Sequence, residues 1–286
     1  MKFLITGGDG QLARCLADIL VKTEHEFVVV SRDKLDITDA RSVKTVITTY
    51  RPDVIINAAA YTAVDRAEVE PDTVMRVNGE AVVYLAEAAN KVGALLIQVS
   101  TDYVFDGDSP QAYTETDIPK PLCVYGVSKL AGERAAENAE RYMIVRVAWL
   151  FSEYGNNFVK TMLKVGAERD ELKIVSDQQG TPTYAGDLAS ALVQMAEASL
   201  PSGAYHFAGG EACSWYDFAQ YIFQCAHEVN EQYAVPKLRK IKTIEHPTAA
   251  RRPAFSVLSH DKLRSFEIAK GDWQTSVRPV IAKLLA

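Results

Sequence analysis

A glycine-rich turn directly after the first apolar run constrains the fold most. Residues 3–6 lead into Gly7-Gly8-Asp9-Gly10, and apolar residues then recur at 12, 16, 19 and 20, the spacing of a helix. Glycines at 7 and 10 permit a tight turn and leave bare backbone at a helix N-terminus, where N–H groups and the helix dipole favour a pyrophosphate. The spacing is G-x-x-G-x-x-A, with Ala13 where a third glycine is usual. The turn therefore predicts a dinucleotide-binding βα unit, although such a turn can also be purely structural.

Short apolar runs alternate with longer helical periods through the first half of the chain. The runs lie at 3–6, 27–30, 54–57, 95–100 and 144–148, and a helix with one apolar face is expected over 74–92. This alternation is typical of a parallel sheet covered by helices on both faces. It predicts an α/β fold with a Rossmann-like, doubly wound parallel sheet over residues 1–150.

After about residue 150 the elements become shorter and aromatic residues more frequent. We expect a smaller, partly helical substrate-binding domain over residues 151–286. A strand at 172–175 and a helix at 187–197 are expected to return to the main sheet, so the segment 171–200 is predicted to belong to the first domain.

Charge and cysteine content exclude several classes of protein. Lys and Arg total 31 against 37 for Asp and Glu, a net charge of −6, and no long basic run offers a surface for nucleic acid. The sequence contains no stretch of about 18 uncharged apolar residues, so it predicts no membrane helix. The four cysteines form no CxxC pair, so we expect neither a disulfide framework nor a metal site, and we predict a cytoplasmic protein.

The end of the second predicted strand bears on the choice of cofactor. Ser31 and Arg32 stand where an acidic residue usually holds the adenosine ribose. A hydroxyl and a guanidinium suit a 2′-phosphate, so the sequence favours NADPH and leaves NADH possible. Arg32 as a plain surface charge is the alternative. Asp36 and Ile37 are placed to seat the adenine, and residues 58–62 to follow the third strand toward the nicotinamide.

A tyrosine and a lysine one helical turn apart are the candidate catalytic pair. Tyr125 and Lys129 share one face of a helix predicted to start near residue 125. A cation beside the phenol is expected to lower its pKa toward the range of acid–base catalysis. Thr101, at the end of the fourth strand, offers a hydroxyl for a reacting carbonyl oxygen. A chance Y-x-x-x-K pattern and a strand-end cap at Thr101 are the alternatives.

These motifs resemble the extended short-chain dehydrogenase/reductases, and within them reductases of nucleotide-linked keto sugars. The likeness spans nearly the whole chain. Its segments are TGGDGQLA at 6–13, NAAAYTAVDRAE at 57–68, STDYVFDG at 100–107, YGVSK at 125–129, RVAWLF at 146–151, GNNFVKTML at 155–163, DQQGTPT at 177–183 and ARRPAFSVL at 250–258. The resemblance implies reduction of dTDP-4-dehydro-β-L-rhamnose at C4, which yields dTDP-L-rhamnose.

The resemblance also implies roles for individual residues. Tyr125 is the implied proton donor, Lys129 its tuner and the anchor of the nicotinamide ribose, and Thr101 the group that orients the carbonyl. The implied pyrophosphate contacts are Gly10, Gln11 and Leu12, and the implied contacts beside the nicotinamide are Ala60, Tyr61 and Thr62, with Ala58 preceding them. The implied sugar-binding positions are Thr101, Asp102 and Trp149, with Asn157 and Arg251 as further substrate candidates.

Several alternatives stay open from the sequence. Trp149 could be a core residue, and Arg251 or Arg252 a surface ion pair. An epimerase or dehydratase of the same family would share the catalytic trio but keep NAD tightly bound. A non-catalytic subunit, related to the regulatory partner of methionine adenosyltransferase, is a different class.

The oligomeric state is predicted from one position at which this sequence differs from the family that it resembles. Some members of the resembling group form a magnesium-bridged dimer through acidic side chains, one of them early in the first helix. Cys15 stands there in this sequence and is a poor ligand for a hard cation. We therefore expect a monomer or a weak homodimer without a metal.

Overall fold

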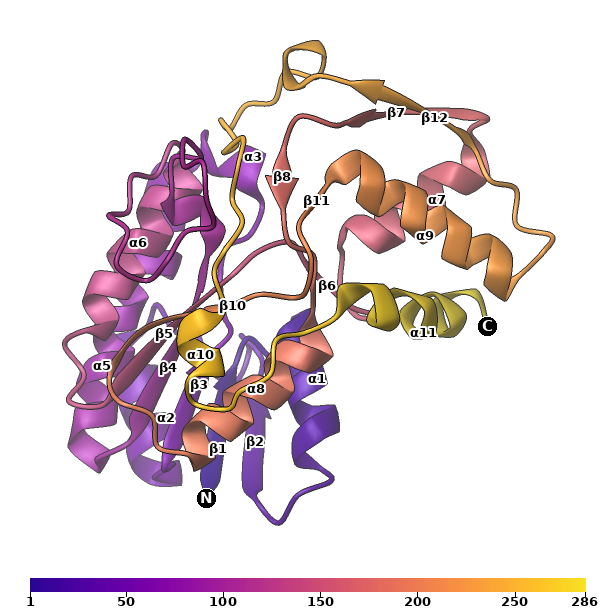
Figure 1. The fold of residues 1–286 in the computed structure, drawn as a ribbon. Coiled ribbons are helices and arrows are strands. Elements are labelled where there is room, and N and C mark those ends of the chain that lie inside the picture. The colour runs from indigo at the N-terminus through magenta and orange to yellow at the C-terminus, as the bar shows by residue number, and fades with distance from the viewer.

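A six-stranded parallel sheet organises the molecule (Figure 1). The computed structural model describes residues 1–286, and the strand order is β10-β5-β4-β3-β1-β2. The strands are β1 (Lys2–Thr6), β2 (Glu26–Val30), β3 (Val54–Asn57), β4 (Leu95–Thr101), β5 (Tyr142–Val147) and β10 (Gly203–Phe207). The chain order reverses beside β1, which places the phosphate turn and the end of β4 on the same carboxyl edge, where open α/β sheets bind ligands.

Helices cover both faces of this sheet. One face carries α1 (Gln11–Leu20) and α8 (Ala185–Glu197), and the other carries α2 (Ala40–Tyr50), α5 (Ala81–Val92) and α6 (Val124–Ala136). Side chains alternate across each strand, so Phe3 and Ile5 of β1 pack under α1 while Leu4 packs on the opposite face.

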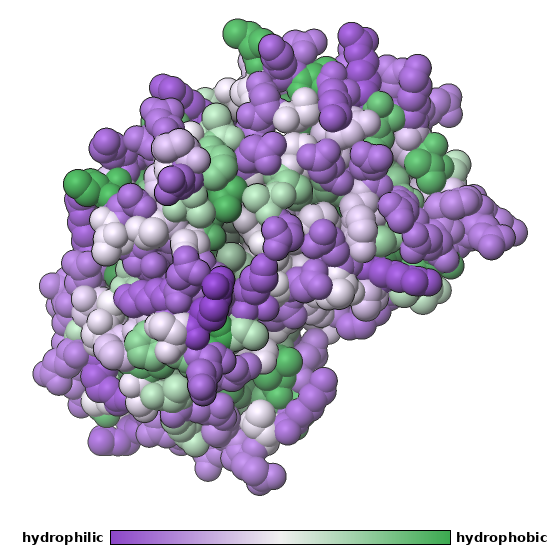
Figure 2. Space-filling model, in the orientation of Figure 1, coloured by the Kyte–Doolittle hydropathy of each residue, from purple (hydrophilic) through white to green (hydrophobic).

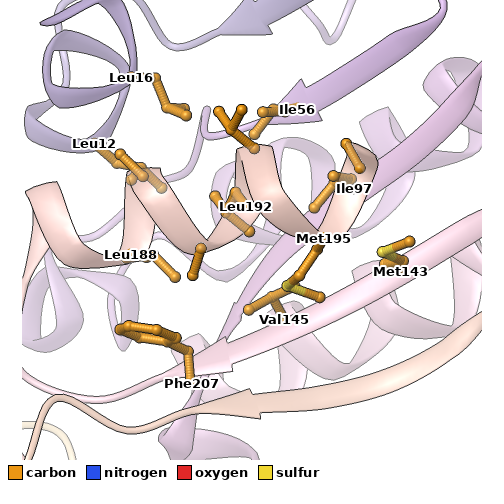
Figure 3. Packing of buried hydrophobic residues seen from close by; sticks show 14 of the residues in the cluster. Leu12, Leu16, Ile56, Ile97, Met143, Val145, Leu188, Leu192, Met195 and Phe207 are labelled. Carbon is orange, nitrogen blue, oxygen red and sulfur yellow. The ribbon is translucent and has the colours of Figure 1, made fainter. Parts of the chain in front are cut away.

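The core on the α8 face is closely packed (Figure 3). Leu188 and Leu192 of α8 belong to one cluster with Ile56 and Ile97 of the sheet, and all four side chains are fully buried. Burying a side chain of this size stabilises the fold by about 1.5–3 kcal/mol. This packing makes the sheet a rigid support for the groups at its carboxyl edge.

Short helical segments connect β3 to α5 and β4 to α6. They are α3 (Val64–Ala67), α4 (Pro71–Met75), the π-helical turn η1 (Arg76–Glu80) and the 3-10 turn η2 (Asp102–Val104). The helix predicted over 74–92 is thus α4, η1 and α5 in sequence.

Apart from α8 and β10, most of the second half of the chain surrounds a separate core to the upper right in Figure 1. It packs α7 (Phe158–Glu168), α9 (Trp215–Val229) and α11 (Trp273–Leu285) together. Three strand pairs accompany them: β7 (Glu171–Val175) with β12 (Lys237–Ile241), β8 (Gln179–Gly180) with β11 (Cys213–Ser214), and β6 (Leu150–Phe151) with β9 (Thr183–Tyr184). The turn η3 (Thr243–Glu245) and helix α10 (Asp261–Arg264) lie on the return path to the main sheet. Weakly polar and apolar residues appear on the surface between the two halves (Figure 2).

The predicted fold class and the five strands of the first half are confirmed. The helix at 187–197 also returns as predicted, since α8 packs against α1. The strand at 172–175 does not: it pairs with β12, and its place at the edge of the main sheet is taken by β10. The division of the chain at residue 150 stays a prediction. No helix combines the length and apolar character needed to cross a membrane.

Candidate active site

The glycine-rich turn lies where the chain must approach two strand ends closely. Gly7 has φ +71°, and a Cβ there would lie 2.8 Å from the Cα of Ala59. A Cβ on Gly8 would lie 3.0 Å from the backbone N of Ser31. Gly10 is the N-cap of α1 and supplies no side-chain cap, so the first N–H groups of that ten-residue helix keep their capacity for an anion. This turn fits a pyrophosphate.

Gln11 and Leu12 offer their backbone rather than their side chains to such an anion. Leu12 is 5% exposed and belongs to the core. The Gln11 amide donates to the carbonyl of Leu150 at 3.3 Å and accepts from Ser152 and Asn157. Gln11 therefore links the turn to the second half of the molecule.

The predicted adenosine-side residues follow β2. Ser31 donates to Asp33, and the exposed Arg32 pairs with Asp36 at 3.3 Å. Asp36 also accepts from Thr38, and Ile37 lies in the core next to α2. A 2′-phosphate at this place would compete with two carboxylates for the hydroxyl and the guanidinium.

The segment after β3 is held at the carboxyl edge by several hydrogen bonds. The N–H of Ala59 donates to the Thr6 hydroxyl at 3.2 Å, and the N–H of Tyr61 donates to the Asn78 side chain at 2.8 Å. The phenol of Tyr61 donates to Glu70. Ala58 and Ala60 are half-buried and Thr62 is exposed, so this segment lines the edge beside α6.

The structure brings Thr101, Tyr125 and Lys129 together. Thr101 ends β4, Tyr125 lies in the first turn of α6, and Lys129 follows one turn later. Helix α6 approaches closely because residue 126 is glycine: a Cβ there would lie 2.3 Å from the carbonyl oxygen of Tyr103. Each of the three side chains is largely buried.

Burial dominates the protonation of the tyrosine. It raises the pKa of Tyr125 above its ordinary value, and the nearby hydroxyl of Thr101 only partly opposes this. The lowering that a neighbouring lysine was expected to cause is not found. The reason is geometric, because the Lys129 ammonium donates to the carbonyl of Val99 at 2.6 Å.

The lysine is itself perturbed. Burial lowers the pKa of Lys129 to about 8, and the carboxylate of Glu133 raises it against that effect. Lys129 therefore titrates just above neutral pH, and the fraction that carries a charge depends on its surroundings.

Asp102 presents an unsatisfied acceptor beside Thr101. It is 2% exposed, and its Oδ1 accepts from the Thr101 hydroxyl at 2.9 Å while Oδ2 has no partner. Burial raises the pKa of Asp102 to about 6, although the nearby hydroxyls of Ser256 and Thr101 lower it. A buried acceptor without a donor is costly, so this oxygen is suited to a hydroxyl brought by a ligand.

Trp149 is strained and half-buried. Its φ of +48° lies in the left-handed region, which a bulky side chain adopts rarely. Its indole stacks on Trp215 with ring centres 3.5 Å apart. Trp149 is thus a supported aromatic surface rather than a fully buried core residue.

The two further substrate candidates differ in their surroundings. Asn157 caps α7, and its amide donates to the carbonyls of Ser152 and Tyr154, so its polar atoms are engaged within the protein. Arg251 is exposed. Its neighbour Arg252 forms a two-pronged ion pair with Asp65 at 2.9 and 3.1 Å.

Three residues near this site escaped the sequence analysis: Ser256, Trp215 and Glu133. For Glu133 a signal existed, since it follows Lys129 by four residues on the same helix. Nothing local marked Ser256 or Trp215, whose partners lie far away in the sequence.

Residues 1–286 match the family model described as the RmlD substrate binding domain. A dTDP-4-dehydrorhamnose reductase from Aggregatibacter actinomycetemcomitans is 46% identical over 289 residues, which cover 98% of each chain. Two solved structures of dTDP-4-dehydrorhamnose reductases are also similar. The one from Clostridium acetobutylicum has a TM-score of 0.95 with 39% identity over 100% of both chains. The one from Bacillus anthracis, in complex with NADP, has a TM-score of 0.93 with 38% identity over 99% of both chains.

Proposed function

This chain belongs to the RmlD substrate binding domain family, and from that premise we propose that it is a reductase that uses NADPH to convert dTDP-4-dehydro-β-L-rhamnose into dTDP-L-rhamnose. One observation carries the proposal: Thr101, Tyr125 and Lys129 meet at the sheet edge where the uncapped start of α1 also lies. Relatives named dTDP-4-dehydrorhamnose reductase match the chain from end to end, which supports the same activity.

The residues of this edge fit a nicotinamide dinucleotide. The backbone from Gly7 to Leu12 would hold the pyrophosphate, and Ser31 with Arg32 would hold the adenosine side. When bound, NADPH supplies the hydride that reduces C4. The NADP complex of the Bacillus anthracis relative favours NADPH. NADH stays possible because Asp33 and Asp36 lie beside Ser31 and Arg32.

The chain's own residues handle the oxygen and its proton. Thr101 and Tyr125 hold the C4 carbonyl oxygen, and Tyr125 gives its proton to that oxygen as the carbonyl is reduced. The raised pKa of Tyr125 suits this role, because the phenol keeps its proton until the alkoxide develops. To stabilise the phenolate that forms, the Lys129 ammonium turns from the Val99 carbonyl toward Tyr125, and the phenolate then regains a proton from solvent.

The sugar is held by groups around the same edge. Oδ2 of Asp102 accepts a sugar hydroxyl, and the Trp149 indole covers an apolar face of the ring. Arg251 is available for the diphosphate. We propose that the nucleotide sugar is a small-molecule substrate used together with NADPH, that neither nucleic acid nor a membrane is a partner, and that the protein acts in the cytoplasm as a monomer or weak homodimer.

A cofactor-consumption assay tests the proposal. Purified protein is mixed with NADPH and freshly generated dTDP-4-dehydro-L-rhamnose while absorbance at 340 nm is followed. A fall in absorbance that matches the sugar consumed supports a reductase. Conversion of the sugar without loss of NADPH would instead indicate an epimerase with recycled cofactor, and no conversion would point to another keto sugar.

A further inference from the structure

A buried ion pair lies directly beneath the candidate catalytic residues. Glu133 of α6 and Arg146 of β5 have side chains only 3% and 6% exposed. Two parallel hydrogen bonds join them: Arg146 Nε donates to Glu133 Oε1 at 2.9 Å, and Nη2 donates to Oε2 at 2.7 Å. Removing two charges from water is costly, so stability alone does not explain this ion pair.

The pair touches both elements that carry the site. Glu133 follows Lys129 by four residues and Tyr125 by eight, so the three side chains share one face of α6. The Ser100 hydroxyl donates to Glu133 Oε1, and Ser100 immediately precedes Thr101 on β4. Glu133 therefore contacts the strand that ends in Thr101 and neighbours the lysine.

The far side of the pair is neutral. His206 of β10 lies beside Arg146 in the sheet, with its Nδ1 3.0 Å from the carbonyl of Tyr113 and its Nε2 3.3 Å from Arg146 Nη1. A carbonyl only accepts, so Nδ1 carries the hydrogen and Nε2 accepts from the guanidinium. Burial and the charge of Arg146 lower the pKa of His206 to about 3, which keeps the imidazole uncharged. Glu133 is thus the single carboxylate that balances Arg146.

From this arrangement we propose that Glu133 is a positioning residue of the active site: anchored by Arg146, it keeps Lys129 charged at neutral pH and fixes the end of β4 through Ser100. The proposal rests on the proposed function, in which the Lys129 cation stabilises the phenolate of Tyr125. Without Glu133, burial alone would act on the ammonium, and Lys129 would lose its proton at lower pH.

No other nearby group raises the pKa of Lys129 in place of Glu133. The titratable groups on the helical elements that pack against α6 before β4 are all half-buried or exposed. They are Asp65 and Arg66 of α3, Asp72 of α4, Arg76 and Glu80 of η1, and Tyr84, Glu87 and Lys91 of α5. Asp102 of η2 and Arg146 of β5 are buried, and Tyr103 of η2 and Tyr142 of β5 are half-buried. None of these groups acts on the pKa of Lys129, whereas Glu133 does.

Two variants separate charge from structure. Glu133→Gln keeps the size of the side chain and removes its charge, and Glu137→Gln removes an exposed carboxylate at the C-cap of α6 as the matched control. Because Glu133→Gln leaves Arg146 buried and unpaired, the double variant Glu133→Gln/Arg146→Gln is made as well, which removes both charges. Thermal melts identify the folded variants.

The first readout is the pH dependence of kcat/KM with NADPH. For Glu133→Gln, and for the double variant, the decline at alkaline pH should move about one pH unit lower than in the unaltered enzyme. Glu137→Gln should leave it in place, and Glu133→Asp should restore most of it. An alkaline decline at the unaltered position in a folded Glu133→Gln or double variant would overturn the proposal.

The second readout needs no turnover. The ¹³Cε resonance of Lys129 in lysine-labelled protein, identified by its loss in Lys129→Met, is titrated in each folded variant. The same downward shift of its midpoint is expected without Glu133, and an unchanged midpoint contradicts the proposal. If the unaltered enzyme consumes no NADPH, the proposed function fails while this titration still decides the role of Glu133.

Discussion

At Tyr125 and Lys129, burial acts on both members of the candidate catalytic pair. It favours the protonated phenol and the neutral amine, so it raises the pKa of Tyr125 and lowers that of Lys129. A reductase needs the phenol protonated before the reaction and a cation beside it afterwards. The tyrosine therefore gains from burial, whereas the lysine needs a carboxylate to offset it.

Replacing the phenol tests its role as proton donor. Tyr125→Phe should lower kcat on the order of 10²-fold or more, since the alkoxide then lacks a positioned acid. NADPH affinity, measured by fluorescence titration, should change far less. Near-native turnover of a folded Tyr125→Phe protein would refute the role.

Asp102 carries a cost that depends on pH. Its pKa is raised from 3.8 to about 6, so the folded protein binds the proton more tightly than the unfolded chain. This preference stabilises the fold fully below pH 3.8 and is lost as the pH rises through about 6. At neutral pH the folded protein instead holds a buried charge at a disadvantage.

Asp102→Asn should therefore raise the free energy of unfolding at pH 8 by about 1–3 kcal/mol and change it little near pH 4. Urea denaturation at both values measures this. Affinity for the nucleotide sugar should fall, because Oδ2 is the acceptor proposed for a sugar hydroxyl. Equal effects at both values would show that the carboxylate charge is not what costs stability.

At the scale of elements, α6 holds the site only because it packs closely on η1. A Cβ on Gly132 would lie 2.1 Å from the carbonyl oxygen of Asn78, so the two segments meet backbone to backbone. The Asn78 side chain in turn donates to Ser128 and accepts from the N–H of Tyr61. The position of Tyr125 thus depends on a contact two turns away.

Gly132→Ala should destabilise the protein by about 1–3 kcal/mol, because the added methyl has no room. Turnover should fall as well, since α6 must shift. Arg134→Ala, at an exposed position of the same helix, is the control and should alter neither quantity. Unfolding in urea gives the first value and the NADPH assay the second, and native stability of Gly132→Ala would contradict this packing argument.

The elements differ in how far the sequence predicts them. The turn at Gly7, the strands of the first half and the Tyr125–Lys129 spacing rest on local patterns, and the structure contains all of them. β10 was missed because it carries His206, a polar residue that interrupts the apolar pattern of a buried strand. His206 is buried because it hydrogen-bonds with Arg146 of β5. β7 was assigned to the wrong sheet. Its residues alternate between buried and exposed, a pattern that indicates a strand but does not show which strand it pairs with.

The candidate site divides in the same way. Thr101, Tyr125 and Lys129 were predicted from their spacing and position. Glu133 and the unsatisfied oxygen of Asp102 gain their meaning from burial and from neighbours on other strands, which no local pattern reports.

At the scale of the whole molecule, the two halves are tied together on either side of the site. Gln11 joins the phosphate turn to Asn157 at the start of α7. Arg252, on the segment that returns from β12, pairs with Asp65 of α3. These ties hold the substrate-side segments near the nucleotide-side edge.

Arg252→Ala should raise KM for the nucleotide sugar several-fold with a smaller effect on kcat, because the segment at 250–252 loses its anchor. The stability cost should be about 1 kcal/mol, since the pair is partly exposed. Arg264→Ala removes a more exposed pair with Asp261 and should leave KM unchanged. Steady-state kinetics measure KM for both variants. Equal KM values would show that the Arg252–Asp65 pair does not anchor the segment.

In the proposed reaction a hydride passes from NADPH to C4 of the keto sugar while Tyr125 supplies the proton. The most direct measurement uses NADPH deuterated at C4 of the nicotinamide, in each of its two stereospecifically labelled forms, with dTDP-4-dehydro-L-rhamnose. One form should give dTDP-L-rhamnose with a single deuterium at C4 of the sugar, seen by mass spectrometry and NMR. Product without deuterium from both forms, or no product at all, would contradict the account.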